Sequence, residues 1–464
     1  MSELATLEAV ETRNPFTGTS LKHYEHMTND EVNDAISKCH EAFHKWKEVS
    51  PEGRAEVIKA IGKALIKAKD ELAQLMTDEM GKTLKQSRQE VDLCAAICDY
   101  TGSIGPKELK TEERDMVNGK KGRVSYSPIG VVYGIQPWNY PSYQVVRYSI
   151  ASLMAGNGVL LKHASNVTGT GKLLERIYRE AGIPVGLFTS LVISHDQSDE
   201  VIKNKLVRGV TLTGSPGAGR KIGQKAAAVL KKTVLELGSN DAYLVFEDAD
   251  IDKAVKACVM GRIYNNGETC IAAKRFIVAE KVYDEFREKF VKAMSEVRTG
   301  DPNDENTQLG PMAREDLREE LHEQVTQSVE HGAKIACGGE IPNGEGFFYP
   351  ATVLENVQPG QPAYEDELFG PVASLIKAKD NEYAMRLAHD SRFGLGGGIF
   401  SKDEDAAIEM AEKHFDTGMV FINSFGLADP AMPFGGVKDS GYGREHGGFG
   451  LKEFVNIKGV SIKS

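Results

Sequence analysis

The fold is decided by the stretch GVTLTGSPGAG, residues 209–219. Its first five residues read as a β-strand, and residues 218–232 read as a helix. The glycine-rich loop between them brings backbone N–H groups to a helix N-terminus, a combination that attracts phosphate. The loop does not spell the G-x-G-x-x-G fingerprint of dinucleotide-binding proteins. The stretch therefore predicts one strand–loop–helix unit of a parallel sheet, with an anion site at the loop.

Strands and helices are expected to alternate on both sides of this stretch, from residue 159 to residue 237. Such alternation predicts a parallel, doubly wound sheet. A second alternating set runs from about residue 242 to residue 423, so the chain is predicted to be an α/β protein with two doubly wound domains. In the first set we expect strands at 159–162, 187–193, 209–213 and 233–237 and helices at 172–181, 197–205 and 218–232.

The N-terminal part of the chain has helical periodicity. Apolar residues recur every three or four positions in 29–49, 55–80 and 90–100, which predicts three helices. Residues 129–135 read as a buried strand, and a β-prone tail follows at 454–462.

Composition excludes several classes of protein. The 464 residues are 41% hydrophobic and 27% charged, as in a soluble globular protein of two or three domains. The net charge of -11 argues against a nucleic-acid partner. Residues 1–8 lack the basic and apolar regions of a signal peptide, and no apolar run approaches the roughly 20 residues of a membrane span. Six scattered cysteines fit reduced thiols, which predicts a cytoplasmic protein.

A candidate nucleophile lies in residues 265–275, NNGETCIAAKR. Cys270 stands here among small and polar residues, where a substrate can reach a thiol, whereas most cytosolic cysteines lie in the core. Three distant segments add an amide donor, Asn139, and two carboxylates, Glu236 and Glu367. A nucleophile, a donor and a base together indicate covalent catalysis.

One motif suggests a different class of enzyme. Residues 40–44, HEAFH, match the H-E-x-x-H pattern of zinc peptidases. His40 and His44 share a helix face with Asn33, Ser37 and Lys47, which indicates a solvated face, and no third-histidine continuation follows. We therefore predict no metal site, and a metal assay would test the peptidase alternative.

The set of motifs resembles the aldehyde dehydrogenase family over nearly the whole chain. The resemblance implies that Cys270 is the nucleophile, Asn139 the oxyanion donor and Glu236 the base, while Glu367 binds the nicotinamide ribose. A structural or binding protein that kept the fold without catalysis is the alternative, as is an acyl-CoA-forming enzyme, against which Glu236 speaks because it can activate water. The matching motifs lie at residues 137–141, 235–238, 265–275, 300–302, 367–372 and 433–445.

The implied cofactor is NAD or NADP. By resemblance, Gly214 and Ser215 lie at the pyrophosphate and Lys162 reaches the adenosine ribose. Family members that favour NAD usually carry Glu three residues after this lysine, but here the residue is Ser165. A carboxylate would repel a 2′-phosphate and a serine would not, so NADP should be accepted. The cofactor site is further expected to include Trp138, Gly238 and Phe369.

Two other departures from the family pattern concern Glu268 and His163. The family usually has Gln at the first position, two residues before the nucleophile, and often Pro at the second. A carboxylate near Cys270 would raise the pKa of its thiol, unless Glu268 points away or is paired.

The resemblance also divides the chain. It implies a dinucleotide-binding domain at 1–109 and 129–237, a catalytic domain at 238–435, and a β oligomerisation segment at 110–128 and 445–464. A partner subunit would cover that segment, because an uncovered sheet edge invites aggregation. We therefore expect a homodimer or a homotetramer and no membrane partner.

The expected substrate is succinic semialdehyde, and the expected product is succinate. Arg147 lies eight residues after Asn139, on the helix that should follow the oxyanion donor, where it would need an anionic partner. That partner could be a protein carboxylate. By resemblance to succinate-semialdehyde dehydrogenases, it is the distal carboxylate of the substrate. Many of those enzymes have a second Arg and a Ser where this chain has Tyr264 and Ala428, so a general medium-chain aldehyde dehydrogenase is the alternative.

Overall fold

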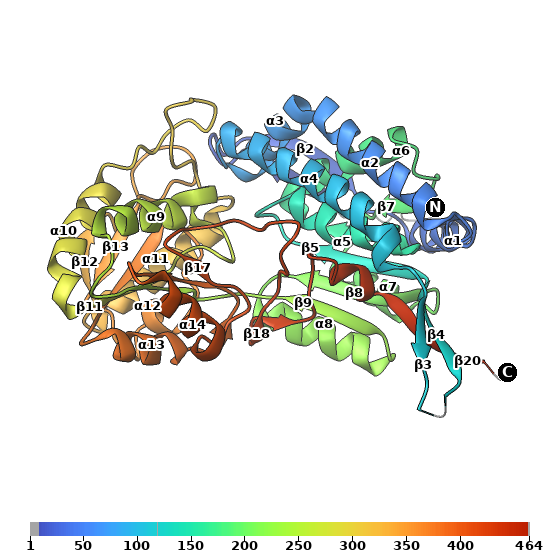
Figure 1. The fold of residues 1–464 in the computed structure, drawn as a ribbon. Coiled ribbons are helices and arrows are strands. Elements are labelled where there is room, and N and C mark those ends of the chain that lie inside the picture. Colours follow the sequence, from blue (N-terminus) through green and yellow to red (C-terminus); the bar gives the residue numbers. More distant parts are fainter. Residues whose placement is uncertain (1–8, 118, 463–464) are drawn as a thin grey trace.

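The structure, a computed structural model, describes residues 9–117 and 119–462, so the expectation for residues 1–8 falls outside it. Figure 1 shows two α/β lobes side by side and a β-hairpin that projects from one of them. Within the described ranges, no helix is long and apolar enough to cross a membrane. The same residues include no group of three or more His, Cys, Asp or Glu side chains that could hold a metal ion, although the His40 and His44 Nε2 atoms lie 3.0 Å apart.

The first lobe contains a six-stranded sheet of order β19-β9-β8-β5-β6-β7. Its strands are parallel except for β19, which comes from the C-terminal part of the chain and pairs antiparallel with β9. The predicted alternation of strands and helices is confirmed. The strands are β5 (Val131–Gln136), β6 (Gly158–His163), β7 (Phe188–Ser190), β8 (Val207–Thr213), β9 (Lys232–Glu236) and β19 (Gly441–Tyr442). Between them lie α5 (Tyr143–Ala155), α6 (Thr168–Glu180), α7 (His195–Lys203) and α8 (Pro216–Ala228).

The helices before this sheet differ from the sequence prediction at one point. The helix expected at 55–80 is two helices, because Ala68 leaves the helical conformation at φ -93° and ψ 11°. Ala68 is neither Gly nor Pro, so no residue in the sequence marks the break. The apolar periodicity continues through it. The helices are α1 (Asn29–Trp46), α2 (Pro51–Lys67), α3 (Lys69–Met80) and α4 (Leu84–Glu108), and a short hairpin of β1 (Ala9–Arg13) and β2 (Ser20–Glu25) precedes them.

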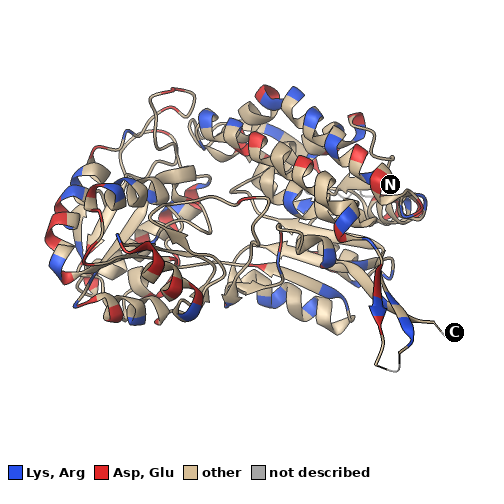
Figure 2. Ribbon diagram, in the orientation of Figure 1, with Lys and Arg blue, Asp and Glu red and all other residues tan. Residues whose placement is uncertain are grey.

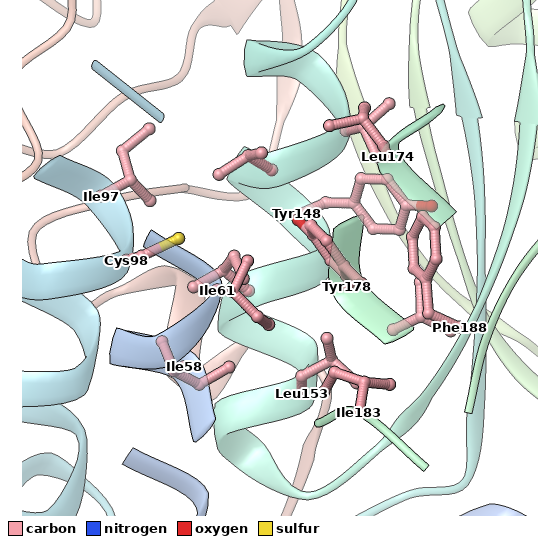
Figure 3. Packing of buried hydrophobic residues seen from close by; sticks show 14 of the residues in the cluster. Ile58, Ile61, Ile97, Cys98, Tyr148, Leu153, Leu174, Tyr178, Ile183 and Phe188 are labelled. Carbon is pink, nitrogen blue, oxygen red and sulfur yellow. The ribbon is translucent and has the colours of Figure 1, made fainter. Parts of the chain in front are cut away.

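Helices α2, α4, α5 and α6 pack together into the largest apolar cluster of the molecule. Figure 3 shows Ile58, Ile61 and Cys98 facing Leu153 and Tyr178 across this cluster. Nearly every side chain of α5 is buried. Since α5 begins just after Asn139 and carries Arg147, its packing holds both residues in place.

The second lobe contains a seven-stranded sheet of order β12-β13-β14-β11-β10-β16-β17. All its pairings are parallel except that of β12 with β13 at one edge. The strands are β10 (Ala242–Val245), β11 (Arg275–Ala279), β12 (Lys334–Cys337), β13 (Thr352–Glu355), β14 (Val372–Ala378), β16 (Gly397–Phe400) and β17 (Phe421–Ile422). The helices are α9 (Ile251–Ile263), α10 (Glu280–Ser295), α11 (Glu315–Glu330), α12 (Pro362–Glu365), α13 (Asn381–His389) and α14 (Glu404–His414).

The projecting hairpin belongs to a third sheet of β3 (Glu112–Asp115), β4 (Lys121–Pro128) and β20 (Val455–Ser461). Ile457 and Val460 on β20 are 59% and 43% exposed, so apolar surface remains uncovered on this sheet. Figure 2 shows acidic and basic residues along the hairpin and both signs of charge on the outer helices.

Candidate active site

Cys270 lies on the loop between α9 and β11, after a short 3-10 helix, η2 (Tyr264–Gly267). Asn265 and Asn266 there adopt left-handed φ values of 56° and 58°, a conformation that Asn tolerates better than most residues. Gly267 follows at φ 74°, and a Cβ on it would lie 2.4 Å from the Gly370 carbonyl carbon. The sharp turn therefore needs its glycine, and it leaves the Cys270 side chain partly accessible.

A cavity of about 480 Å³ reaches this thiol from the carboxyl ends of the strands of the first sheet. Clefts of this kind are where doubly wound sheets bind ligands. Eight of the predicted site residues line the cavity together, drawn from both lobes. They are Trp138, Asn139, Gly214, Ser215, Gly238, Cys270, Glu367 and Phe369.

The Asn139 side chain is held beside the nucleophile loop. Its Nδ2 donates to the Glu268 carbonyl at 3.0 Å, and Asn265 Nδ2 donates to the Asn139 carbonyl at the same distance. His163 secures the same segment, because its Nε2 lies 2.8 Å from the Pro141 carbonyl oxygen. Burial lowers the pKa of His163 to about 4, so the ring is neutral and its Nε2–H can donate to that carbonyl. The amide of Asn139 is thus placed at the cavity wall next to Cys270.

The surroundings of Cys270 favour its protonated thiol. Burial raises the pKa of the thiol to about 12. The charges of Arg147 and Lys274 lower this pKa, and those of Glu367 and Glu236 raise it. Because the side chain is partly accessible, water in the cavity will moderate the effect of burial. Glu268 turns towards the Ala313 N–H, from which its Oε1 accepts a hydrogen bond at 3.0 Å.

Glu236 ends β9 and is 2% exposed. Neither carboxylate oxygen accepts a hydrogen bond from any residue within 9–117 or 119–462. Burial raises its pKa well above the ordinary value, while Arg147 opposes this shift. A buried carboxylate of raised pKa without fixed partners is suited to proton transfer. Glu236 does not itself line the cavity, although its charge contributes to raising the pKa of the Cys270 thiol.

Glu367 lies at the cavity wall in an ion pair with Lys274, at 3.1 Å between Oε1 and Nζ. A Cβ on Gly238 would lie 2.5 Å from Glu367 Oε2, so a side chain at this position would displace the carboxylate from its present place. Trp138 and Phe369 meet edge to face at 5.7 Å between ring centroids.

The other end of the cavity fits a dinucleotide. Ser215 Oγ accepts from the Ala218 N–H at 3.2 Å and caps α8, whose N-terminus faces the cavity. The backbone at Gly214 is open, because a Cβ there would meet nothing closer than 3.8 Å. Free N–H groups at a helix N-terminus bind phosphate. Lys162 and Ser165 do not line this cavity but a separate smaller one, and burial lowers the pKa of Lys162.

Arg147 is buried on α5 and does not line the cavity that reaches Cys270. Its guanidinium forms an ion pair with Glu445, and its Nη2 donates to Thr213 Oγ1 at 2.9 Å. The ring of Phe434 lies 4.6 Å from the guanidinium carbon. The structure therefore contains the protein carboxylate that the sequence left open as a partner for this arginine.

Two residues of the site escaped the sequence analysis. Glu445 stands inside the quoted motif 433–445, yet only its contact with Arg147 gives it a role. Lys274 stands four residues after Cys270, and its charge is the one feature of the sequence that could have marked it as a site residue. The pairs Arg147–Glu445 and Lys274–Glu367 join residues far apart in the sequence, so no spacing rule predicts either pair.

Comparisons with known proteins agree on one family. A family model described as the aldehyde dehydrogenase family matches residues 3–460. The NAD(P)+ succinate semialdehyde dehydrogenase Sad of Escherichia coli (strain K12) is 45% identical over 447 residues, covering 96% of each chain. The NADP(+) succinate-semialdehyde dehydrogenase of Deinococcus radiodurans is 40% identical, covering 96% of this chain and 93% of that protein.

Solved structures agree as well. The crystal structure of succinic semialdehyde dehydrogenase from Streptococcus pyogenes in complex with NADP+ superposes with a TM-score of 0.96 at 36% identity. The superposition covers 98% of this chain and 100% of that one.

Proposed function

The chain belongs to the aldehyde dehydrogenase family, and from this premise we propose that it oxidises succinic semialdehyde to succinate with NAD or NADP. The observation that carries the proposal is the cavity in which the Cys270 thiol, the Asn139 amide and the open N-terminus of α8 meet.

The reaction starts with addition of the Cys270 sulfur, as thiolate, to the aldehyde carbonyl, which gives a tetrahedral thiohemiacetal. Asn139 Nδ2 and the Cys270 N–H donate to its oxyanion. When bound, the cofactor would supply its nicotinamide as the acceptor of the hydride that this adduct releases, which would leave a thioester on Cys270. Glu236 then takes a proton from water, the water oxygen attacks the thioester, and the acid leaves as the thiolate is restored. Per turnover, one aldehyde, one oxidised cofactor and one water become one carboxylic acid, one reduced cofactor and one proton.

Succinic semialdehyde is favoured over uncharged aldehydes for two reasons. The relatives named above are succinate semialdehyde dehydrogenases. Arg147 supplies a buried positive charge near Cys270, and its Nη1 has no hydrogen-bond partner within the described residues. Arg147 does not line the cavity in this structure, so the proposal requires that the substrate carboxylate open a path to this donor, while Glu445 keeps the other side of the guanidinium.

Both NAD and NADP fit the residues at the adenosine end. Ser165 there brings no negative charge against a 2′-phosphate. The relatives' names include NAD(P)+ and NADP(+). The Glu367 carboxylate is the acceptor for the nicotinamide ribose, and Lys162 is the donor at the adenosine ribose.

The assembly is a homodimer or homotetramer, formed by covering the sheet of β3, β4 and β20 with a partner's sheet. The proposed domains are a dinucleotide-binding domain at 1–109 and 129–237 and a catalytic domain at 238–435. We further propose a cytoplasmic protein, which the six free cysteines support because reduced thiols are typical of that compartment.

A panel of aldehydes tests the proposal. Purified protein is assayed with succinic semialdehyde and with pentanal, each with NAD and NADP, while the reduced cofactor is followed. We expect the highest kcat/KM for succinic semialdehyde. Equal values for pentanal would make a general aldehyde dehydrogenase the better description.

The control is Cys270→Ala, which should lose oxidation but still bind dinucleotide, because the thiol is needed only for addition. Activity of this variant within about tenfold of the wild type would end the covalent mechanism. A wild type that is inactive towards all aldehydes would support a non-catalytic protein.

A further inference from the structure

We propose that Lys274 is a positioning residue for the oxyanion donor, because its ammonium fixes the peptide bond whose N–H belongs to Cys270. The inference rests on the proposed function, since it names the group that orients one of the two oxyanion donors.

The Lys274 side chain is buried against the nucleophile loop, with 1% of its surface exposed. Its Nζ donates to the Thr269 carbonyl at 3.1 Å and to the Cys270 carbonyl at 2.5 Å. The third contact is the ion pair with Glu367. The ammonium thus has two backbone carbonyls as hydrogen-bond acceptors and one carboxylate as its counter-charge, as a buried charge requires.

The contact with Thr269 sets the direction of the Cys270 N–H. The two groups belong to one peptide unit, which is planar and trans, so the N–H points away from the carbonyl oxygen. The Ala272 N–H also donates to the Thr269 oxygen, at 3.1 Å, so two donors hold this peptide from one side. Among residues 9–117 and 119–462, none accepts a hydrogen bond from the Cys270 N–H. This donor is therefore left free on the side opposite Lys274.

The cavity supports the same direction. Cys270 and Asn139 line it, whereas Lys274 does not. The ammonium thus lies behind the loop and the reacting carbonyl in front of it. A cation on the Thr269 carbonyl also polarises the peptide and strengthens its N–H as a donor. A residue that served only Glu367 would need neither carbonyl contact.

Two reactions of the same thiol separate this role from others, and neither requires the cofactor. In p-nitrophenyl acetate, the Cys270 thiolate adds to the carbonyl, an oxyanion forms, and the C–O bond breaks to release p-nitrophenolate and leave an acetyl thioester. With iodoacetamide, the thiolate displaces iodide from carbon, and no oxyanion forms. The ratio of the acylation rate to the alkylation rate at one pH cancels the fraction of thiolate. The ratio therefore reports the oxyanion donors.

We expect Lys274→Met to lower this ratio at least about tenfold, because loss of one oxyanion donor typically costs a hundred- to a thousandfold. Lys274→Gln, which keeps a donor for the carbonyls but not the charge, should fall between Met and the wild type. The midpoints of thermal unfolding of both variants show whether each is folded. If Lys274→Met does not fold, Lys274→Gln still tests the proposal.

An unchanged ratio in a folded variant would overturn the proposal. If the ratio is unchanged and only KM for NADP rises, the role of Lys274 is confined to Glu367. If both rates fall equally, Lys274 acts only on the charge of the thiol. A wild type that acylates normally but does not oxidise succinic semialdehyde would refute the proposed function and leave the Lys274 assignment standing.

Discussion

At the scale of single residues, burial and the charge of Arg147 have opposite effects on the pKa values of Cys270 and Glu236. Burial raises the pKa of Cys270 and of Glu236, while the positive charge of Arg147 lowers both. Both groups act in their ionised forms, so both the addition step and the hydrolysis step should become faster as the pH rises. Each step can be isolated by a variant.

Glu236→Gln should separate the two steps. Without the carboxylate, thioester hydrolysis is slow, so we expect a burst of reduced cofactor of at most about one per active site, followed by slow turnover. In the wild type the steady-state rate should keep rising above neutral pH, because the pKa of Glu236 is raised. In the variant that rise should vanish from the steady state but persist in the burst, which depends on the thiol. Stopped-flow absorbance across pH measures both, and equal loss of burst and steady state would place Glu236 in the first step.

Arg147→Met should cost roughly 2–5 kcal/mol in kcat/KM for succinic semialdehyde, as for truncating one side of a desolvated ion pair. The single variant leaves Glu445 buried without its cation, so the matched control is Arg147→Met with Glu445→Gln. In the double variant, pentanal should be oxidised almost as in the wild type while succinic semialdehyde stays impaired. If both aldehydes suffer equally in that control, Arg147 supports the protein rather than the substrate.

Ser165→Glu should move cofactor preference towards NAD, because a carboxylate repels the 2′-phosphate and accepts from ribose hydroxyls. The measurement is the ratio of kcat/KM for NADP to that for NAD, with Ser165→Gln as the uncharged control. A wild type that rejects NADP outright would mean that another residue performs the exclusion.

At the scale of elements, a buried carboxylate positions helix α5. Glu90 Oε1 accepts from the Ser142 and Tyr143 N–H groups, both at 2.8 Å, at the N-terminus of that helix. Its Oε2 pairs with Lys82, which is also buried. α5 has no side-chain cap of its own, so Glu90 supplies from α4 the acceptor that its first turn lacks.

Glu90→Gln should lower the midpoint of thermal unfolding, since Lys82 is then left buried without its counter-charge. Breaking a buried pair on one side typically costs about 3–5 kcal/mol. Adding Lys82→Met removes the stranded charge and should restore part of the loss. If the double variant is less stable than Glu90→Gln, the ion pair is not the source of the effect. Differential scanning calorimetry compares the three proteins.

At the scale of the whole molecule, the uncovered apolar side chains of β20 bear on assembly. Ile457→Lys with Val460→Lys should lower the molar mass in solution, because charges at those exposed positions prevent a partner sheet from covering them. Size-exclusion chromatography with light scattering measures this, with Ile408→Lys as a control at an exposed apolar residue on α14. A monomeric wild type, or an unchanged mass in the variant, would contradict the proposed assembly.

The sequence by itself determined the two parallel sheets and the loop that presents Cys270. Those features depend on periods of two and 3.6 residues and on local turn chemistry, which neighbouring residues decide. It did not predict the break at Ala68, because no Gly or Pro marks it. Only the tertiary structure decided that Arg147 meets Glu445, that Glu268 turns to the Ala313 N–H, and that Lys274 pairs with Glu367. Such contacts depend on how buried charges find partners once distant segments pack together, and spacing along the chain carries no record of that.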